Sequence, residues 1–277
     1  MKRAIILLIA LLLPISAMAG GETKQVLLLG TDDIMRDLTQ TAEMSRADAI
    51  YVASLSDEGV RLLSIERDYR VSLPDQPDNK LATTTFFGGP ELCMDSVNNL
   101  LSLELSRYVQ ISKDTVAEAV NIIGGVSVAI HEDEKPVLRK AMGYIPKQGD
   151  DGLYKLNGKL AVGFLSARED NIDDIESNAR RNDRQQRFVS AVMDLVRSKS
   201  FDEAIGIADK IVPLIKTNLT MADIVGLIRT VQTGKGEFRY ARSPITEYSR
   251  TQAGLHQVIE VNDMALEIQK VDEFFKE

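Results

Sequence analysis

Val60-Arg61-Leu62-Leu63-Ser64-Ile65-Glu66-Arg67-Asp68 is the stretch that decides the fold, because it begins as an apolar run and ends in charges. A second apolar run, Asp48-Ala49-Ile50-Tyr51-Val52-Ala53-Ser54-Leu55, precedes it. The residues between the two runs, Ser56-Asp57-Glu58-Gly59, are of types that favour turns. Two runs of this length and spacing predict a pair of strands joined as a β-hairpin.

Charged residues flank the open end of this predicted hairpin. Arg46 and Asp48 lie at the start of the first strand, and Arg67 and Asp68 follow the second. Because the strands of a hairpin are antiparallel, we expect the two pairs to lie side by side. A carboxylate can hold a metal ion while guanidinium groups hold phosphate oxygens, so the set suggests a site for an anion and a metal. The alternative is a salt-bridged strand end of the kind common on protein surfaces.

Composition places the chain among ordinary soluble proteins. It has 277 residues, 44% hydrophobic and 27% charged, enough to bury a large core. The net charge of -8 argues against broad nucleic-acid binding, which requires a basic face. No repeat, low-complexity segment or linker interrupts the chain, so we predict one continuous domain over residues 24–277.

The first 19 residues have the features of an export signal. Lys2 and Arg3 precede the apolar run Ala4 to Leu13, and Ala17-Met18-Ala19 forms a small-x-small cleavage site. The apolar run is short for a membrane span, which needs about 18–20 residues. We therefore expect an exported protein, with an uncleaved membrane anchor as the alternative.

Cys93, the only cysteine, excludes an internal disulfide framework. The two histidines form no recognisable pattern with it, so we expect neither a catalytic thiol nor a zinc site. Cys93 is predicted to be a small buried residue.

The rest of the chain alternates predicted strands and helices. Lys24 to Gly30 is a strongly apolar strand, expected in the middle of the sheet, and Thr31-Asp32-Asp33 follows it. Pro136 to Asp151 is predicted to be irregular, and a long helix is predicted from about Asn178 to Ser198. The pattern is that of an α/β protein.

Arginines on that long helix form a second candidate site. Arg181, Arg184, Gln185 and Phe188 have the spacing of one helix face, and this face is apolar further along. A guanidinium that points toward a core needs an anion. The arginines also fall near the predicted start of the helix, where backbone N–H groups favour anions. A solvated basic face paired with the acidic residues Asp170 to Glu176 is the alternative.

Six segments of the chain carry polar or glycine-containing motifs. In chain order they are Leu28-Leu29-Gly30-Thr31-Asp32, Arg46-Ala47-Asp48, Ser64-Ile65-Glu66-Arg67-Asp68, Gly124-Gly125-Val126, Leu156-Asn157-Gly158-Lys159-Leu160-Ala161 with Arg168, and Arg181-Asn182-Asp183-Arg184-Gln185-Gln186. Together they resemble the LytR-CpsA-Psr family of cell-wall glycopolymer transferases. The resemblance implies an α/β/α sandwich around a mixed central sheet, with a cavity that holds a polyprenyl tail. It also implies action outside the membrane, on the extracytoplasmic face of the cell membrane or in the wall.

The resemblance further implies a reaction and a set of roles. The family moves a phospho-glycopolymer from a polyprenyl pyrophosphate carrier to a peptidoglycan sugar hydroxyl, a phosphotransfer with Mg²⁺ at the membrane surface. By motif position, Asp32 and Asp48 hold Mg²⁺. The pyrophosphate contacts are Arg46, Arg67, Arg168, Arg181 and Gln185, of which Arg46, Arg67 and Arg168 are the expected catalytic residues. Phosphoryl transfer of this kind depends on positioning and charge neutralisation and needs no protein nucleophile.

Three positions depart from the family pattern. Glu66 stands where the family has proline, Ser166 where it has an additional arginine, and Asn178 where it has an acidic residue. Glu66 adds negative charge, and the other two remove a phosphate contact and a charge partner or base. A family member that binds polyprenyl phosphates or wall glycans without transfer, or one that hydrolyses the pyrophosphate, is therefore the alternative function.

Overall fold

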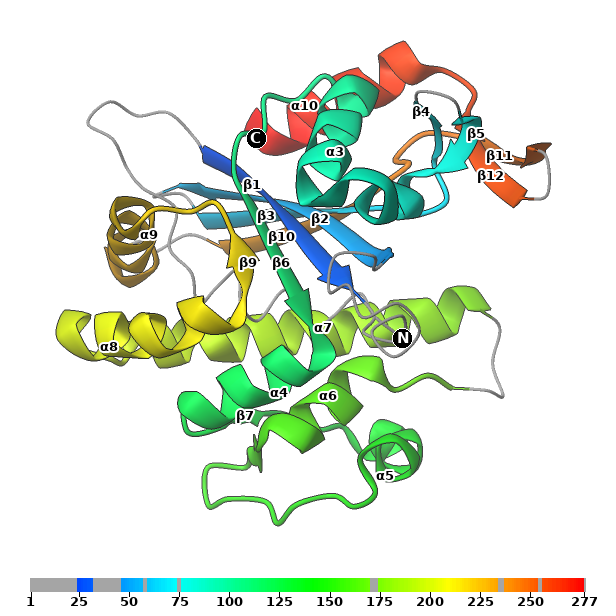
Figure 1. Cartoon of the computed structure of the whole chain (residues 1–277). Coiled ribbons are helices and arrows are strands. Elements are labelled where there is room, and N and C mark those ends of the chain that lie inside the picture. The colour runs from blue at the N-terminus through cyan, green and yellow to red at the C-terminus, as the bar shows by residue number, and fades with distance from the viewer. Residues whose placement is uncertain are drawn as a thin grey trace.

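A six-stranded mixed sheet forms the centre of the protein in a computed structural model that describes residues 24–31, 46–56, 59–73, 76–169, 174–233, 237–253 and 256–276. The strand order is β10-β3-β2-β1-β6-β9 (Figure 1). The strands of this sheet are β1 Lys24–Thr31, β2 Ala47–Ser56, β3 Gly59–Ile65, β6 Tyr108–Ser112, β9 Lys216–Thr217 and β10 Glu237–Ser243.

The predicted hairpin of two antiparallel strands is confirmed. β2 and β3 pair antiparallel, with Ile50 opposite Ile65. β1 lies between β2 and β6, antiparallel to the first and parallel to the second, so its predicted central place is also confirmed. Successive side chains of a strand point to opposite faces of the sheet, so a central strand can bury side chains on both faces.

Helices cover both faces of the sheet, which makes the fold the predicted α/β/α sandwich (Figure 1). One face carries α3 Thr84–Leu101 and α10 Met264–Lys276. The opposite face carries α4 Lys113–Ile122, α5 Lys135–Met142, α6 Gly158–Ser166, α7 Asp174–Arg197, α8 Phe201–Ile211 and α9 Met221–Thr233. Short 3₁₀ turns are η2 Leu81–Thr83, η3 Glu132–Glu134 and η4 Val212–Leu214.

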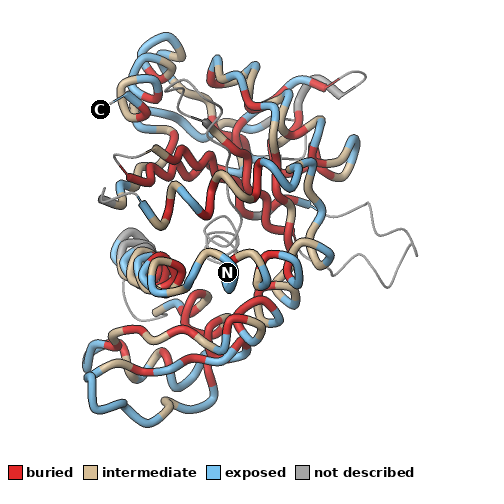
Figure 2. Tube along the Cα trace, turned by 90° about the vertical axis from the view of Figure 1, so that its left-hand side faces the viewer, coloured by how far each residue is buried: buried red, intermediate tan, exposed pale blue. Residues whose placement is uncertain are grey.

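The two faces of the sheet bury separate apolar clusters. Val26 and Leu28 of β1 belong to the cluster under α7, whereas Leu27 and Leu29 belong to the cluster under α3. All four side chains are at most 1% exposed. Buried positions follow the central strands and the inner sides of the helices, and exposed positions follow their outer sides (Figure 2). The continuous apolar runs of the sequence thus correspond to strands buried on both faces.

The described residues form three two-stranded sheets outside the main sheet: β4 Arg70–Leu73 with β5 Gln76–Lys80, β7 Val126–Val128 with β8 Tyr154–Leu156, and β11 Tyr248–Ala253 with β12 His256–Val261. The β11–β12 hairpin is bound to the turn after β3. The Ile259 N–H donates to the Asp68 carbonyl at 2.8 Å, and Tyr69 forms an isolated β-bridge with Ile259. Through these bonds the β11–β12 hairpin is held beside Arg67.

The predicted long helix is confirmed as α7 except for its start, and one segment predicted to be irregular is partly helical. The segment predicted to be irregular contains α5, in which Pro136 occupies the first turn, where a missing N–H costs nothing. The long helix begins at Asp174, four residues before Asn178, so that Asp174 and Glu176 belong to its first turn. Acidic residues there complement the helix dipole.

Candidate functional site

The open end of the hairpin brings the predicted residues of the sheet together. The register places Ile65 opposite Ile50, so Arg67 follows β3 near the level at which Asp48 enters β2. Arg46 directly precedes β2, and Thr31 at the end of β1 pairs with Ala47. Asp32, the residue after β1, lies outside the described residues. The side-by-side placement predicted from the sequence is confirmed for the backbone of Arg46, Asp48 and Arg67.

A β-bulge lies at Asp48. Gly30 pairs with Ala49 and Thr31 pairs with Ala47, so Asp48 is the extra residue of β2. Bulges bend a strand locally and are frequent beside active sites. The bulge therefore marks this sheet end as locally distinct from the regular ladder below it.

The two arginines at this sheet end face solvent. Arg46 is exposed, and the Arg67 side chain is 45% exposed with its Nε 3.9 Å from the Asp68 carboxylate. Exposed guanidinium groups remain able to reach a ligand at low cost, since a contact of this length is a weak surface ion pair.

The arginine face of α7, by contrast, is buried. Arg181 and Gln185 are each 2% exposed and Arg184 is 0% exposed. Phe188, one turn further along, is in the apolar cluster beneath the sheet. The predicted orientation of this face toward the core is confirmed, and the solvated basic face is wrong for these three side chains.

Arg184 is neutralised by protein groups. Its Nη1 lies 3.1 Å from Glu169 and 3.6 Å from Glu134, and its Nη2 donates to the Ala167 carbonyl at 2.7 Å. Arg187 binds both oxygens of Glu134, at 2.9 and 2.7 Å. These contacts give Arg184 a structural role, because a buried cation with two carboxylates needs no ligand.

Glu134 is the centre of this network. Burial by itself raises the pKa of the Glu134 carboxyl, but the hydrogen bonds from Arg187 and from the His131 N–H act in the opposite direction. With the charges of Arg187 and Arg184 added, the pKa of Glu134 lies below its ordinary value. Glu134 is therefore ionised in the folded protein at neutral pH and balances the cations of α7.

Arg168 lies beside α7 through the same network. Its two neighbours in the chain, Ala167 and Glu169, both contact Arg184, and the Ser177 hydroxyl donates to the Glu169 carbonyl at 3.1 Å. Arg168 itself is exposed. The structure thus brings Arg168 close to the α7 turns that carry Arg181 and Gln185.

Gln185 differs from its neighbours in having no partner. Neither its Nε2 nor its Oε1 has a hydrogen bond anywhere in the described part of the chain, although both atoms are buried. A buried polar group without a partner costs about 1–3 kcal/mol, so native proteins rarely keep one without a reason. Gln185 lies one helical turn from Arg181 on the same face of α7. We call this pair of buried polar side chains, at the edge of the apolar cluster, the polar step.

One part of the sequence-based case for this helix was wrong. Because α7 starts at Asp174, Arg181 lies about two turns inside the helix. The free N–H groups and the dipole act only over the first turn, so they do not help Arg181 or Gln185 to bind an anion. The anion site on α7 rests on side chains alone.

The departures from the family pattern have different structural outcomes. Glu66 is buried and forms an ion pair with Arg242 of β10, so its charge is compensated within the fold. The Ser166 hydroxyl donates to the Gly163 carbonyl of its own helix at 3.4 Å, and the side chain carries no cation. Asn178 is in α7, and its side chain lies outside the described residues.

The described residues contain no group of three or more His, Cys, Asp or Glu side chains that could hold a metal. The predicted ligands Asp32 and Asp48 are not tested by this finding. The pairing of Thr31 with Ala47 does place the Asp48 backbone beside the end of β1, where the chain continues to Asp32. Carboxylate oxygens are ligands that Mg²⁺ favours, so the residue types of Asp32 and Asp48 suit that ion.

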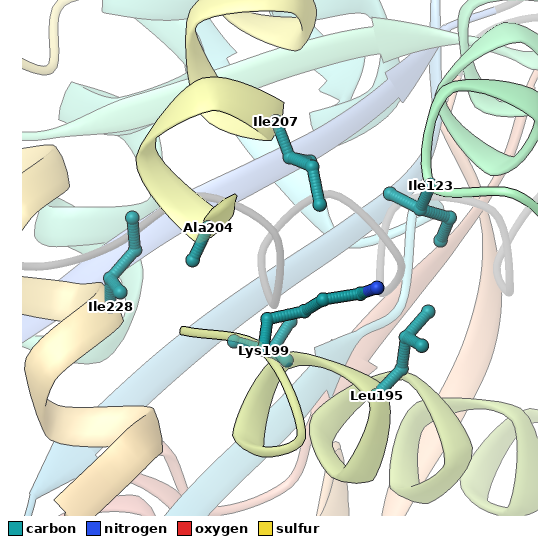
Figure 3. Close-up of a pocket in the computed structure, with 7 residues that line it drawn as sticks. Ile123, Leu195, Lys199, Ala204, Ile207 and Ile228 are labelled. Carbon is teal, nitrogen blue, oxygen red and sulfur yellow. The ribbon is translucent and has the colours of Figure 1, made fainter. Parts of the chain in front are cut away.

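A small apolar pocket lies at the other end of α7 (Figure 3). Its lining comes from α4, α7, α8, α9 and the turn after α7: Ile123, Leu195, Val196, Lys199, Ala204, Ile207 and Ile228. At 1.5 Å per residue, Leu195 lies about 21 Å along the helix from Arg181. The side chains between them on the core side, Phe188, Val189 and Val192, are all fully buried.

None of the helices in the described ranges is both long and apolar enough to cross a membrane. Residues 1–19, the predicted export signal, lie outside those ranges, so the signal remains a prediction.

Sequence reasoning missed Glu134 and Glu169 as partners of the α7 arginines. Glu134 is 53 residues from Arg187 in the chain, and no spacing rule connects the two. The acidic run Glu132-Asp133-Glu134 was a signal for a counter-charge but did not identify its partner.

Comparison with known proteins gives consistent matches. The polyisoprenyl-teichoic acid–peptidoglycan teichoic acid transferase TagT of Bacillus subtilis is 26% identical over 213 residues, which cover 75% of this chain and 64% of that protein. The transferase TagU of Halalkalibacterium halodurans is 26% identical over 245 residues, covering 82% and 77%. TagV of Bacillus subtilis is 27% identical over 201 residues, covering 70% and 50%. The chain thus matches less than two thirds of the length of TagT and of TagV.

Solved structures give the same fold. The crystal structure of Bacillus subtilis TagT has a TM-score of 0.66 at 20% identity and covers 94% of this chain and 92% of that one. TagT bound to LIIa-WTA has a TM-score of 0.67 at 21% identity and covers 95% of each chain. The LytR_cpsA_psr family profile matches residues 14–270. The family match over nearly the whole chain, with the shared fold, establishes that this protein belongs to the LytR_cpsA_psr family.

Proposed function

We propose that this protein is a phosphotransferase that moves a glycopolymer from a polyprenyl pyrophosphate carrier to a sugar hydroxyl of peptidoglycan. In this reaction the hydroxyl oxygen attacks the sugar-bearing phosphorus. The bond between that phosphorus and the bridging oxygen breaks, and polyprenyl phosphate leaves. The hydroxyl proton passes to solvent or a nearby base. Relatives of this chain are named as teichoic acid transferases, which supports the transfer of a glycopolymer.

The observation that carries the proposal is the buried amide of Gln185, which has no hydrogen-bond partner among the described residues and lies one turn from Arg181 on the same face of α7. A phosphate oxygen would accept from the amide nitrogen, and the Arg181 cation would balance its charge. Arg184 on the same face is already neutralised by Glu169 and Glu134. Only part of the arginine helix is therefore available for a ligand.

The remaining arginines would complete the phosphate site. Arg168 lies beside α7, and Arg46 and Arg67 lie at the open end of the sheet hairpin. Cations on both sides of a pyrophosphate neutralise charge that builds up on the leaving oxygen, which is the main requirement of phosphoryl transfer. Asp32 and Asp48 would hold Mg²⁺, which supplies further charge neutralisation at the phosphate oxygens.

An apolar tail would follow the core side of α7. The buried residues Phe188 and Val192 lie between the polar step and the apolar pocket at the far end of the helix. A polyprenyl chain gains by leaving water in such surroundings. This arrangement fits a carrier whose head stays at the sheet end. The proposed site of action is accordingly the extracytoplasmic membrane surface.

A second candidate is a protein that binds the lipid carrier without transfer. It is favoured by Ser166, which provides a locally bonded hydroxyl where the family has an additional arginine. Ser166→Arg should raise turnover about tenfold or more if that missing cation limits the reaction, since one charged contact contributes about 1.5–3 kcal/mol. Unchanged turnover would mean that another group already supplies the contact.

Release of polyprenyl phosphate from a short lipid-linked sugar donor tests the proposed activity. Arg67→Ala should abolish release and leave the fold intact, because the Arg67 side chain is 45% exposed and substitutions at exposed positions usually change stability little. Arg70→Ala is the matched control, since Arg70 is similarly exposed and is paired with Glu260. Equal release by wild type and Arg67→Ala would refute the proposed role.

A further inference from the structure

A cluster of cations continues outward from Arg67. Asp68 is 17% exposed, and its carboxylate lies 2.9 Å from Lys80 Nζ, 3.8 Å from Arg250 Nη1 and 3.9 Å from Arg67 Nε. Three basic side chains therefore converge on one carboxylate. We call Arg67, Lys80 and Arg250 the Asp68 cluster.

The cluster is built from three separate elements that the backbone holds together. Arg67 follows β3, Lys80 ends β5, and Arg250 is in β11. Arg250 lies opposite Ile259 in the β11–β12 hairpin, and Ile259 donates its N–H to the Asp68 carbonyl at 2.8 Å. Lys80 pairs with Arg70 across β4–β5. The two hairpins lie together on one side of the molecule, next to the end of β3 (Figure 1).

The charge of the cluster is opposite to that of the protein. The chain carries a net charge of -8, whereas here three cations converge on one carboxylate among the described side chains. The neighbouring Glu66 does not reduce this excess, because its carboxylate is buried and paired with Arg242. Lys80 and Arg250 are 25% and 43% exposed, so both can contact a ligand while they remain near Asp68. A local basic surface on an acidic protein attracts anions selectively.

We propose that Lys80 and Arg250 bind a phosphodiester of the glycopolymer itself, beyond the pyrophosphate. The assignment rests on the proposed function. When the pyrophosphate of a donor lies against Arg67, the sugar chain of that donor extends out of the site. Lys80 and Arg250 lie next to Arg67 around the same Asp68 carboxylate, so the sugar chain can pass over them. A polymer with one negative charge per repeat is the chemistry that such a row of cations recognises. Lys80 and Arg250 therefore select phosphate-bearing glycopolymers over neutral ones.

Two lipid-linked donors test this selection. One carries a disaccharide with no phosphate beyond the pyrophosphate, and the other carries the same disaccharide extended by several glycerol phosphate units. The double variant Lys80→Gln/Arg250→Gln should lower kcat/KM for the extended donor about five- to tenfold and leave the short donor within about twofold. The difference should shrink as NaCl is raised, because salt screens exposed charges.

Arg70→Gln is the matched control, because Arg70 lies on the same hairpin and its charge is paired with Glu260. It should leave both donors unchanged. Arg250→Gln alone adds a milder test, since Arg250 is further from Asp68 than Lys80 and its removal disturbs the carboxylate less. Equal losses on the two donors would overturn the proposal and mean that the cluster acts through Arg67 or through the acceptor. Wild-type kinetics of the double variant on the extended donor would also overturn it.

Direct binding of soluble poly(glycerol phosphate), which has no lipid and no pyrophosphate, separates this proposal from the proposed function. Calorimetry should give about five- to tenfold weaker binding for the double variant than for wild type and Arg70→Gln. This result would hold even if wild type turned over neither donor. Equal binding by all three proteins, or no binding by wild type, would overturn the assignment of Lys80 and Arg250.

Discussion

Gln185→Met should make the free protein more stable while it weakens ligand binding. Methionine has the length of glutamine and no polar atom that requires a partner, so the substitution removes the two buried amide atoms and keeps the packing volume. In the described part of the protein neither amide atom has a hydrogen bond, and the side chain is 2% exposed. Within those described residues, the change therefore removes no hydrogen bond.

The magnitude follows from the cost of a buried, unpaired polar group, about 1–3 kcal/mol. For a chain of this size each kcal/mol corresponds to about 2–4 °C in thermal midpoint, so Gln185→Met should melt roughly 2 to 12 °C higher than wild type. Binding should change in the opposite direction. A hydrogen bond to a charged group contributes about 1.5–3 kcal/mol, so Kd for a prenyl pyrophosphate should rise about tenfold or more.

Thermal denaturation with and without geranylgeranyl pyrophosphate measures both effects in one assay. Gln186→Met is the matched control, because Gln186 is the next residue of the same helix and is only half-buried. That control should show neither effect. A lower midpoint for unliganded Gln185→Met would mean that the amide is satisfied in the free protein. Unchanged affinity for the pyrophosphate would mean that the amide does not contact it.

Three further predictions concern the network around α7 and the core. Glu134→Gln should lower the free energy of unfolding, measured by urea titration, by about 3 kcal/mol, because it leaves buried cations poorly compensated. The control is Glu132→Gln, which should change this free energy by no more than about 0.5 kcal/mol, because the Glu132 side chain is 86% exposed. The pKa of Glu134 in the folded protein lies below 4.5, so its stabilisation is present above about pH 4.5 and is lost as the pH falls through that lower pKa. Wild type should therefore lose this stability on acidification, and Glu134→Gln should not. Parallel curves of stability against pH for the two proteins would contradict the assignment. Burial raises the pKa of the Cys93 thiol to about 12, so iodoacetamide at pH 8 should label it only after unfolding, as mass spectrometry would detect; rapid labelling of the native protein would contradict its placement in the core.

The sheet could be predicted from the sequence because its signals are local. Two apolar runs joined by turn residues determine the β2–β3 hairpin, and the register then places Arg67 near Asp48. The β1 strand was predictable in the same way, since a short uninterrupted apolar run indicates burial on both faces. Both features need only neighbours in the chain.

The roles of the individual arginines could not be predicted, because their partners are distant in sequence. Arg181 and Arg184 share one buried helix face and have equivalent spacing. Only the structure distinguishes them, by placing Glu134 and Glu169 beside Arg184. The same holds for Arg250, whose closeness to Asp68 depends on the β11–β12 hairpin packing against the turn after β3. Such contacts arise from tertiary packing and leave no periodic pattern.

The missed helix α5 has a different cause. Proline breaks a helix at most positions. In the first turn of a helix, where Pro136 lies, proline removes only an N–H that has no intrahelical partner. The early start of α7 likewise turned an expected acidic loop into the first turn of that helix. This correction removes the helix dipole from the proposed anion site and leaves Arg181 and Gln185 as its α7 contribution.

The most direct test of the proposed transfer is the mass of its product. Purified protein would be incubated with Mg²⁺, a polyprenyl-pyrophosphate-linked sugar and a peptidoglycan oligomer. The proposal predicts an oligomer heavier by the phospho-sugar, together with free polyprenyl phosphate, and loss of both with EDTA and in Arg67→Ala. Polyprenyl phosphate with an unmodified oligomer would indicate hydrolysis, and bound donor with no product would indicate a binding protein; either result would contradict transfer.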